Sequence, residues 1–268
     1  QEAGLVLSTQ SSTPLEAVAD AIRDDPERGP LWFQLYLQHD RGFNTELIRR
    51  AEAAGYEALV LTVDAPCSGA RDRERAAGFR LPPGISAVNL AGLPPRPARD
   101  LAPGRSGLFD DLLHDAPTWD DIAWLQAQTR LPVILKGVLH PDDALEAARQ
   151  QVGGIIVSNH GGRTLDTLPT TVDALPAVVD AVGGSLPVLV DGGIRRGTDV
   201  LKAMALGASA VLIGRPYIFG LANAGALGVA HVIRLLRDEL EIAMALCGAR
   251  TLQKLPDGLL GKPAQPRR

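Results

Sequence analysis

The sequence predicts an α/β fold, a TIM (β/α)8 barrel that lacks its N-terminal βα unit in this chain. Short apolar runs rich in Val, Ile and Leu alternate with amphipathic segments of helical period along most of its length. Runs without a polar face are typical of buried parallel strands, and repeated strand–helix units form parallel sheets. The 268 residues are also close to the roughly 250 of a typical barrel.

The alternation predicts seven strands and seven helices. The expected strands cover residues 5–9, 31–37, 58–64, 132–138, 154–159, 186–191 and 210–214. The expected helices cover residues 14–22, 44–54, 118–129, 141–151, 171–183, 197–206 and 225–246. A doubly wound open sheet has the same alternation, so periodicity alone leaves both architectures open.

Local signals mark several helix ends. Thr118 precedes Trp119 and two aspartates, which is typical of an N-cap followed by acids in the first turn. Pro14 is expected at the first position of its helix. Gly55 and Gly207 follow helical patterns directly, as glycines that close helices commonly do.

A closed barrel needs eight units, one more than the seven found. The first apolar run, at residues 5–7, follows almost directly on Gln1. We therefore expect a single barrel domain over residues 1–268 that is incomplete at its N-terminus. A stretch at about 76–117 is rich in Pro and Gly and has little periodicity. Long loops in compact domains are usually active-site lids or disordered, so this stretch predicts a lid, with a plain surface insertion as the alternative.

Composition argues against several classes of function. The net charge is −4 with acids and bases interspersed, whereas a nucleic-acid binder usually has a basic face. Cys67 and Cys247 lie far apart and form no CxxC pattern, which predicts free thiols, no metal site and a cytoplasmic location. No apolar run reaches the roughly 18 residues of a membrane span, so no membrane anchor is expected.

Polar residues stand at the end of every expected strand, where parallel α/β folds collect their chemistry. They are Ser8, Thr9, Gln34, Tyr36, Thr62, Asp64, Lys136, Ser158, His160, Asp191 and Arg215. Any one of them alone is more often a structural residue. Together they predict a functional site at this end of the fold.

The last two expected strands end in glycine-rich segments. Asp191, Gly192, Gly193, Ile194 and Arg195 follow one strand, and Gly214 and Arg215 follow the other. Glycine lets backbone N–H groups approach an anion, and the two arginines add charge-assisted contacts. Phosphate sites of TIM barrels often lie in these two loops, so a phosphate-bearing ligand is predicted, with a pair of tight turns as the alternative.

His160 is the candidate catalytic base. It is followed by two glycines and by Arg163, and the imidazole pKa of about 6.5 suits proton transfer near neutral pH. The planar guanidinium of Arg163 matches a carboxylate, and Arg71 is a second candidate for that role. The remaining histidines, interpreted as surface residues, are His39, His114, His140 and His231.

These motifs resemble the FMN-dependent 2-hydroxy acid oxidases and dehydrogenases. The segment 158–166, SNHGGRTLD, is similar to the SNHGxRQLD signature of that family. Further matches occur in the family's order at QLY (34–36), LTVD (61–64), LKG (135–137), DGGIR (191–195) and GRP (214–216). The resemblance covers residues from about 5 to 250.

The resemblance implies an FMN enzyme that oxidises a small L-2-hydroxy acid to the 2-oxo acid, with oxygen or another electron acceptor, as a homo-oligomer, specifically a tetramer. His160 would be the base and Asp64 would stabilise its imidazolium. Tyr36 would contact the substrate hydroxyl or oxo group, and Arg71 and Arg163 would bind its carboxylate. The implied FMN-binding residues are Ser8, Gln34, Thr62, Lys136, Ser158, Asp191, Gly192, Gly193, Ile194, Arg195, Gly214 and Arg215.

The chain also departs from the family pattern. No residues correspond to the family's first barrel strand or to a tyrosine that helps bind the substrate carboxylate. Gln10 lies near a position where some members carry an aromatic residue, and Thr164 replaces the usual Gln. A catalytically inactive fragment and another phosphate-binding barrel enzyme, such as an isomerase, therefore stay open as alternatives.

Overall fold

A computed structural model of the chain describes residues 3–97, 99–113, 116–256 and 258–261. Seven parallel strands form one sheet in which each strand pairs with its neighbours in the sequence. They are β1 (Leu5–Ser8), β2 (Leu31–Leu35), β3 (Ala58–Thr62), β4 (Val133–Val138), β5 (Gly154–Val157), β6 (Val188–Val190) and β7 (Ala210–Val211). The order of a doubly wound sheet reverses at a switch point, so this sequential order settles the choice in favour of the barrel type. Within the described chain, β1 and β7 are the two edges of the sheet.

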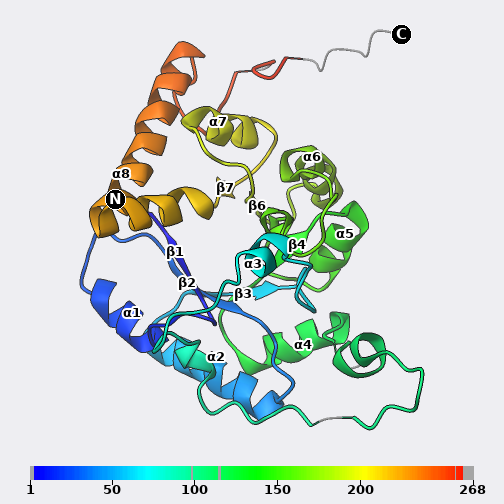
Figure 1. Ribbon diagram of the computed structural model, residues 1–268. Helices are drawn as coiled ribbons and strands as arrows, with labels where there is room; N and C mark the ends of the chain where they lie inside the picture. Colours follow the sequence, from blue (N-terminus) through cyan, green and yellow to red (C-terminus); the bar gives the residue numbers. More distant parts are fainter. Residues whose placement is uncertain (1–2, 98, 114–115, 257, 262–268) are drawn as a thin grey trace.

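Helices surround the strands in chain order (Figure 1). They are α1 (Leu15–Ile22), α2 (Arg41–Ala54), α4 (Trp119–Gln128), α5 (Pro141–Arg149), α6 (Thr171–Val182), α7 (Gly197–Ala205) and α8 (Arg215–Leu246). All seven expected strands and helices are therefore confirmed. Short helices that the sequence did not predict are α3 (Asp72–Ala76), η1 (Val88–Leu90), η2 (Gly107–Leu112) and η3 (His160–Gly162).

Alternation along the strands divides the core into two parts, because successive side chains point to opposite faces of a sheet. The larger part, with Phe33, Leu59, Leu135 and Ile155, packs between the sheet and the helices. The smaller part lies on the concave face and is built by Ala58, Val60, Ile134, Ile156 and Leu189. Val6, Trp32 and Leu212 pack against this inner layer.

Most of the expected helix ends are confirmed. Thr118 and Asp121 form a capping box at the start of α4, and Gly55 ends α2 in the left-handed conformation with φ of 87°. Pro14 is an exception, since it occupies the N-cap and α1 begins one residue later, at Leu15. A proline at the N-cap offers no side-chain oxygen, so the free N–H of Leu15 needs a partner from elsewhere.

Helix α8 begins ten residues before its expected start at 225. Its backbone is not helical at Ala224 and Gly225, so two arms meet at a sharp bend, visible as the gold and orange segments of Figure 1. The arms pack closely: a Cβ added to Gly228 would lie 1.9 Å from the carbonyl oxygen of Gly220. Arg215, expected to follow a strand in a turn, is instead the first residue of this helix.

The earlier start also makes α8 long and apolar enough to cross a membrane, by length and composition alone. This corrects the expectation that no segment reaches that length. Core helices of other proteins can have the same length and composition. The backbone of α8 is also not helical at Ala224 and Gly225, so α8 is not one straight helix over its full length.

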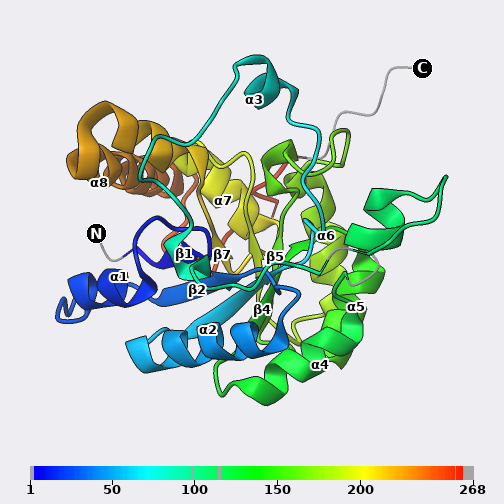
Figure 2. The same cartoon turned by 60° about the horizontal axis from the view of Figure 1, so that its bottom comes forward.

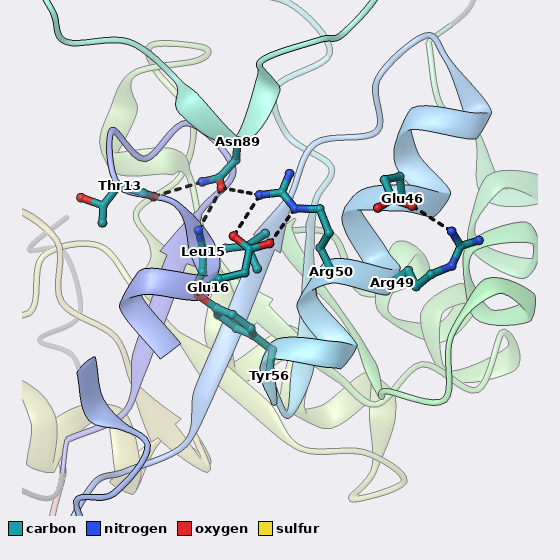
Figure 3. A network of polar contacts seen from close by, with 8 residues as sticks. All are labelled: Thr13, Leu15, Glu16, Glu46, Arg49, Arg50, Tyr56 and Asn89. Atoms are coloured by element: carbon teal, nitrogen blue, oxygen red, sulfur yellow. Dashed lines mark hydrogen bonds and ion pairs between the residues drawn. The ribbon is translucent and has the colours of Figure 1, made fainter. Parts of the chain in front are cut away.

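The described part of the segment at 76–117 is tied to the barrel at Asn89. This fully buried side chain accepts a hydrogen bond from the N–H of Leu15 at 3.0 Å and donates one to the carbonyl of Thr13 at 3.3 Å (Figure 3). Asn89 thereby supplies the cap that Pro14 lacks. Arg50 of α2 extends the network by binding both Asn89 and Glu16.

Candidate active site

A tier of polar side chains lies directly above the inner layer of the core. Each stands two residues after an inner-layer residue on its own strand, so the period of two places it on the same concave face. The pairs are Val6 and Ser8, Trp32 and Gln34, Val60 and Thr62, Ile134 and Lys136, Ile156 and Ser158, and Leu189 and Asp191. The sheet thus gathers six of the predicted FMN-binding residues at one end of the strands.

The first three strands carry an uncharged part of this tier. Ser8 donates to the side-chain oxygen of Gln34 at 3.1 Å, and the Gln34 amide donates to Thr62 at 2.9 Å. Gln34 and Thr62 are buried, and so is the neighbouring Thr9, whose hydroxyl donates to the Gln34 carbonyl at 2.5 Å. These bonds fix three strand ends relative to one another.

The next three strands carry a charged part. The ammonium group of Lys136 donates to the Ser158 hydroxyl at 3.0 Å and pairs with the carboxylate of Asp191 at 3.3 Å. Both charged side chains are 17% exposed, and Ser158 is fully buried. The Lys136 ammonium group is therefore held in place on the concave face, and its N–H groups can also donate hydrogen bonds to a ligand.

His160 and Asp64 meet above this tier. His160 Nδ1 lies 2.8 Å from Asp64 Oδ1, and the two side chains are 18% and 9% exposed. Gly137 makes room for the pair, because a Cβ there would lie 2.5 Å from the Asp64 Cβ. Its φ of 115° also favours glycine. The second Asp64 oxygen is buried and has no hydrogen-bond partner in the described chain.

A close backbone contact brings the two predicted carboxylate-binding arginines into one region. A Cβ on Gly69 would lie 2.2 Å from the carbonyl oxygen of Thr164, so the loop after β3 presses against the loop after β5. Arg71 and Arg163 then bind the same acid: Glu74 lies 3.3 Å from Arg71 and 3.0 Å from Arg163. We call these three residues the arginine–Glu74 cluster.

A cavity of about 720 Å³ opens beside these groups. His160, Tyr36 and Arg71 line it, and so do Leu90, Arg96 and Leu112 of the segment at 76–117, but Arg163 does not. Burial, followed by the nearby Asp64 carboxylate, raises the pKa of Tyr36, while Arg71 and Arg163 oppose the shift. Tyr36 therefore stays a protonated phenol, able to donate a hydrogen bond, throughout the neutral range.

The two predicted phosphate loops lie at this same end, after the adjacent parallel strands β6 and β7. Gly192 and Gly193 have φ of 85° and 82°, which L side chains rarely adopt. Arg215 reaches back toward the loop of His160, since its Nη2 would lie 3.2 Å from a Cβ on Gly161. The buried Ile194 anchors the first loop in the core.

Both predicted phosphate-binding arginines are available for an anion. Neither Arg195 nor Arg215 forms an ion pair with an acid in the part of the chain that the structure describes. The backbone N–H groups of Arg195 and Arg196 are already bound by Asp199. An anion here would therefore meet guanidinium groups and the glycine segment rather than those two amides.

Several residues at the site were not assigned a role from the sequence. Glu74 is the most consequential, and its spacing of three from Arg71 on a helix was the available signal. His39 is exposed, as expected for a surface residue, and it also lines the cavity. Gln10, suspected of altering the pocket, does line the cavity.

His140 and His231 have other surroundings. His140 is the N-cap of α5, where its ring accepts from the N–H of Asp142, and His231 is exposed on α8. His114 lies outside the described residues. Within the described chain, no group of three or more His, Cys, Asp or Glu residues could hold a metal ion, and both cysteines are unpaired.

Comparisons with known proteins agree with this geometry. The family model for FMN-dependent dehydrogenase matches residues 1–262. An L-lactate oxidase of Roseobacter sp. (strain GAI101) is 52% identical over 262 residues, which are 97% of this chain and 69% of that protein. Glycolate oxidase 1 of Zea mays is 46% identical, with 94% of this chain and 68% of that protein covered.

A solved structure has the same architecture. The crystal structure of a mandelate oxidase with 3,3-difluoro-2-hydroxy-3-phenylpropionic acid aligns with a TM-score of 0.79 at 43% identity. The alignment covers 93% of this chain and 67% of that one. From the family match, these relatives and the shared fold, the chain belongs to the FMN-dependent dehydrogenase family.

Proposed function

We propose that this chain oxidises small L-2-hydroxy acids to 2-oxo acids, with FMN bound and oxygen as the favoured electron acceptor. The observation that carries the proposal is the His160–Asp64 pair, which opens into the same cavity as Tyr36 and Arg71. A base, a phenol donor and a carboxylate-binding cation are the groups that a 2-hydroxy acid requires. Relatives named as lactate, glycolate and mandelate oxidases support this substrate class.

His160 accepts the substrate proton in this proposal. With Nδ1 directed at Asp64, the other ring nitrogen, Nε2, is free to take up a proton. Asp64 fixes the ring and stabilises the imidazolium that forms, because its carboxylate is mostly buried and its charge is poorly screened. The pair therefore acts as one proton-accepting unit.

Tyr36, Arg71 and Arg163 orient the acid. The guanidinium groups bind its carboxylate, and the Tyr36 phenol donates to the hydroxyl or oxo oxygen. Fixing both ends of a small molecule turns an encounter into an oriented complex, which lowers the entropic part of the barrier. Arg163 must move toward the cavity for this, since it does not line the cavity in the structure.

The residues present fit FMN. Two unpaired arginines beside a glycine segment suit its phosphate, and the hydrogen-bonded chain of Ser8, Gln34 and Thr62 offers hydrogen bonds to the isoalloxazine ring. Lys136 places a positive charge on the concave face, where it would favour an anionic reduced ring. When bound, FMN supplies the acceptor for the two electrons that leave the substrate.

The test is spectroscopic and kinetic. Purified protein should be yellow, and anaerobic L-lactate, glycolate or L-mandelate should bleach the flavin absorption. Oxygen uptake measured with and without an artificial electron acceptor separates an oxidase from a dehydrogenase. A colourless protein that cannot be loaded with FMN would support the inactive-fragment alternative. A flavin-loaded protein that none of the three acids reduces would contradict the substrate class.

The oligomeric state, the cellular location and the roles of individual site residues remain predictions. We infer a homo-oligomer, which is a tetramer by family resemblance, and a cytoplasmic location. The assignment of individual roles to site residues has the same standing, and is tested by the substitutions described below.

A further inference from the structure

Glu74 occupies the position between the two arginines that the substrate carboxylate would need. Its Oε1 lies 3.0 Å from Arg163 Nη2, and its Oε2 lies 3.3 Å from Arg71 Nη1. Each carboxylate oxygen thus meets a different guanidinium group. This is how a bound organic acid shared between two arginines would be held.

The contact also explains where Arg163 points. Arg71 lines the cavity with His160 and Tyr36, whereas Arg163 does not, and Glu74 is its ion-pair partner. The Arg163 side chain is 50% exposed and that of Glu74 is 40% exposed, so the pair stands at the solvent edge. As long as Glu74 holds Arg163, only one of the two arginines faces the cavity.

The element that carries Glu74 is easily displaced. Helix α3 has only five residues and none of them is buried. In Figure 2 it stands above the strands, on the side away from α2 and α4. Exposed ion pairs contribute little free energy, and segments with few buried contacts open at low cost. Moving Glu74 therefore disturbs no packed core.

We propose that Glu74 is an internal competitor for the substrate carboxylate: it holds Arg163 off the cavity, and a 2-hydroxy acid binds by displacing it. This inference rests on the proposed function, because it takes Arg71 and Arg163 as the residues that bind the substrate carboxylate. Glu74 thereby sets the affinity for organic acids without touching the reacting atoms.

The competitor is present over the whole working range of pH. The hydrogen bond from Arg163, with smaller contributions from Arg71, holds the pKa of Glu74 below its usual value. Glu74 is therefore ionised throughout the neutral range of pH. The competition depends on the concentration of the organic acid, and mild acidification does not relieve it.

The opposite role would be that Glu74 positions the arginines for substrate. In that case the arginine–Glu74 cluster would persist in the complex, and removing the Glu74 charge would weaken binding. Competition predicts that removing the charge strengthens binding. The two roles thus differ in the sign of one measured quantity.

The experiment measures equilibrium binding of pyruvate, a 2-oxo acid that undergoes no further oxidation by this route. Binding to the FMN-loaded full chain is followed by the change in flavin absorption and by calorimetry. We expect Glu74→Gln to lower the dissociation constant roughly threefold to fivefold, as for release of an exposed ion pair. The matched control is Asp72→Asn, on the same helix, whose carboxylate pairs with Arg75 and with neither arginine of the cluster. It should stay within about twofold of the unsubstituted chain.

A second variant separates this inference from the proposed function. Arg163→Met should weaken pyruvate binding, and in the Arg163→Met background Glu74→Gln should no longer tighten it. If Arg163→Met weakens binding but Glu74→Gln leaves it unchanged or weaker, the competitor role is overturned and the arginine assignment stands. If Arg163→Met has no effect on binding, the arginine assignment fails and the competitor role fails with it.

Discussion

The His160–Asp64 pair and the arginine–Glu74 cluster both bring an acid against a base at the carboxyl ends of the strands, but they are held in different ways. The first is buried, with side chains 18% and 9% exposed, and follows directly from strands β3 and β5. The second stands at the solvent edge, on a short helix and a loop, with side chains 39–50% exposed.

The difference in burial fits the two tasks that the proposed function gives the site. A proton acceptor needs a fixed geometry and a poorly screened partner charge, which burial on a sheet supplies. A group that binds and releases substrate needs contacts weak enough to exchange, which solvent screening supplies. In the proposed function, the two regions therefore divide proton transfer from substrate binding.

Replacing His160 tests the buried side of this comparison and should have the largest effect. His160→Ala removes the proton acceptor, so kcat should fall on the order of 10²- to 10⁴-fold. The visible flavin absorption should be retained, because the implied FMN-binding residues are elsewhere. His231→Ala, at an exposed position of α8, is the control and should leave kcat unchanged. Loss of flavin in parallel with turnover would reassign His160 to cofactor binding.

Replacing Arg163 tests the exposed side, and its effect should fall on KM. Arg163→Met removes charge-assisted hydrogen bonds to the substrate carboxylate, which are worth about 1.5–3 kcal/mol, or roughly 10- to 100-fold. Steady-state kinetics should show this increase in KM with a smaller change in kcat. Arg149→Met removes another partly exposed arginine, on α5, and should change neither constant. An unchanged KM in Arg163→Met would mean that the substrate is held elsewhere.

The buried region was predictable from the sequence and the exposed cluster was not. All seven strands, and the polar residue that ends most of them, could be recognised because alternation fixes which side chains share a face. The same periodicity places Ser8, Gln34, Thr62, Lys136, Ser158 and Asp191 one step above the inner layer of the core. The register between neighbouring parallel strands then places these six side chains next to one another.

No comparable periodicity predicts which loops contact each other. Glu74 and Arg163 are 89 residues apart, and their meeting depends on the close approach of Gly69 to the backbone of Thr164. Likewise, α8 was expected to begin at 225 and begins at Arg215. In the structure the two arms pack at Gly220 and Gly228, a tertiary contact that favours the glycines. Tertiary contacts therefore decide what local propensity leaves open.

Replacing Asn89 extends the comparison to the segment at 76–117, where one buried polar side chain should matter more than the surrounding ion pairs. Asn89→Ala removes the acceptor for the N–H of Leu15 and the donor to Thr13, so the free energy of unfolding should fall by about 1–3 kcal/mol. Urea unfolding measures the loss, with Asn223→Ala, exposed on α8, as the control. Equal stability of the two variants would show that the segment at 76–117 is not anchored at this point.

The Glu16–Arg50 pair belongs to the same network but is partly exposed, and it should have the smallest effect. The hydrogen bond from Arg50 lowers the pKa of Glu16, so its ionised form is favoured in the folded state. The resulting stability is present above the ordinary glutamate range of about pH 4.3 and is lost as pH falls through the lowered folded-state pKa. Because the Glu16 side chain is 44% exposed, screening limits the contribution to below about 1 kcal/mol.

Glu16→Gln should therefore lower the free energy of unfolding slightly at pH 7 and leave a smaller difference from the unsubstituted chain at about pH 3.5. Glu46→Gln is the matched control, because Glu46 pairs with Arg49 three residues along the same helix and joins no other element (Figure 3). Urea unfolding of both variants at the two pH values provides the measurement. If the Glu16 difference equalled that of Glu46, or grew as pH fell, the pair would not link α1 to α2, and the stability of this region would rest on the buried Asn89 alone.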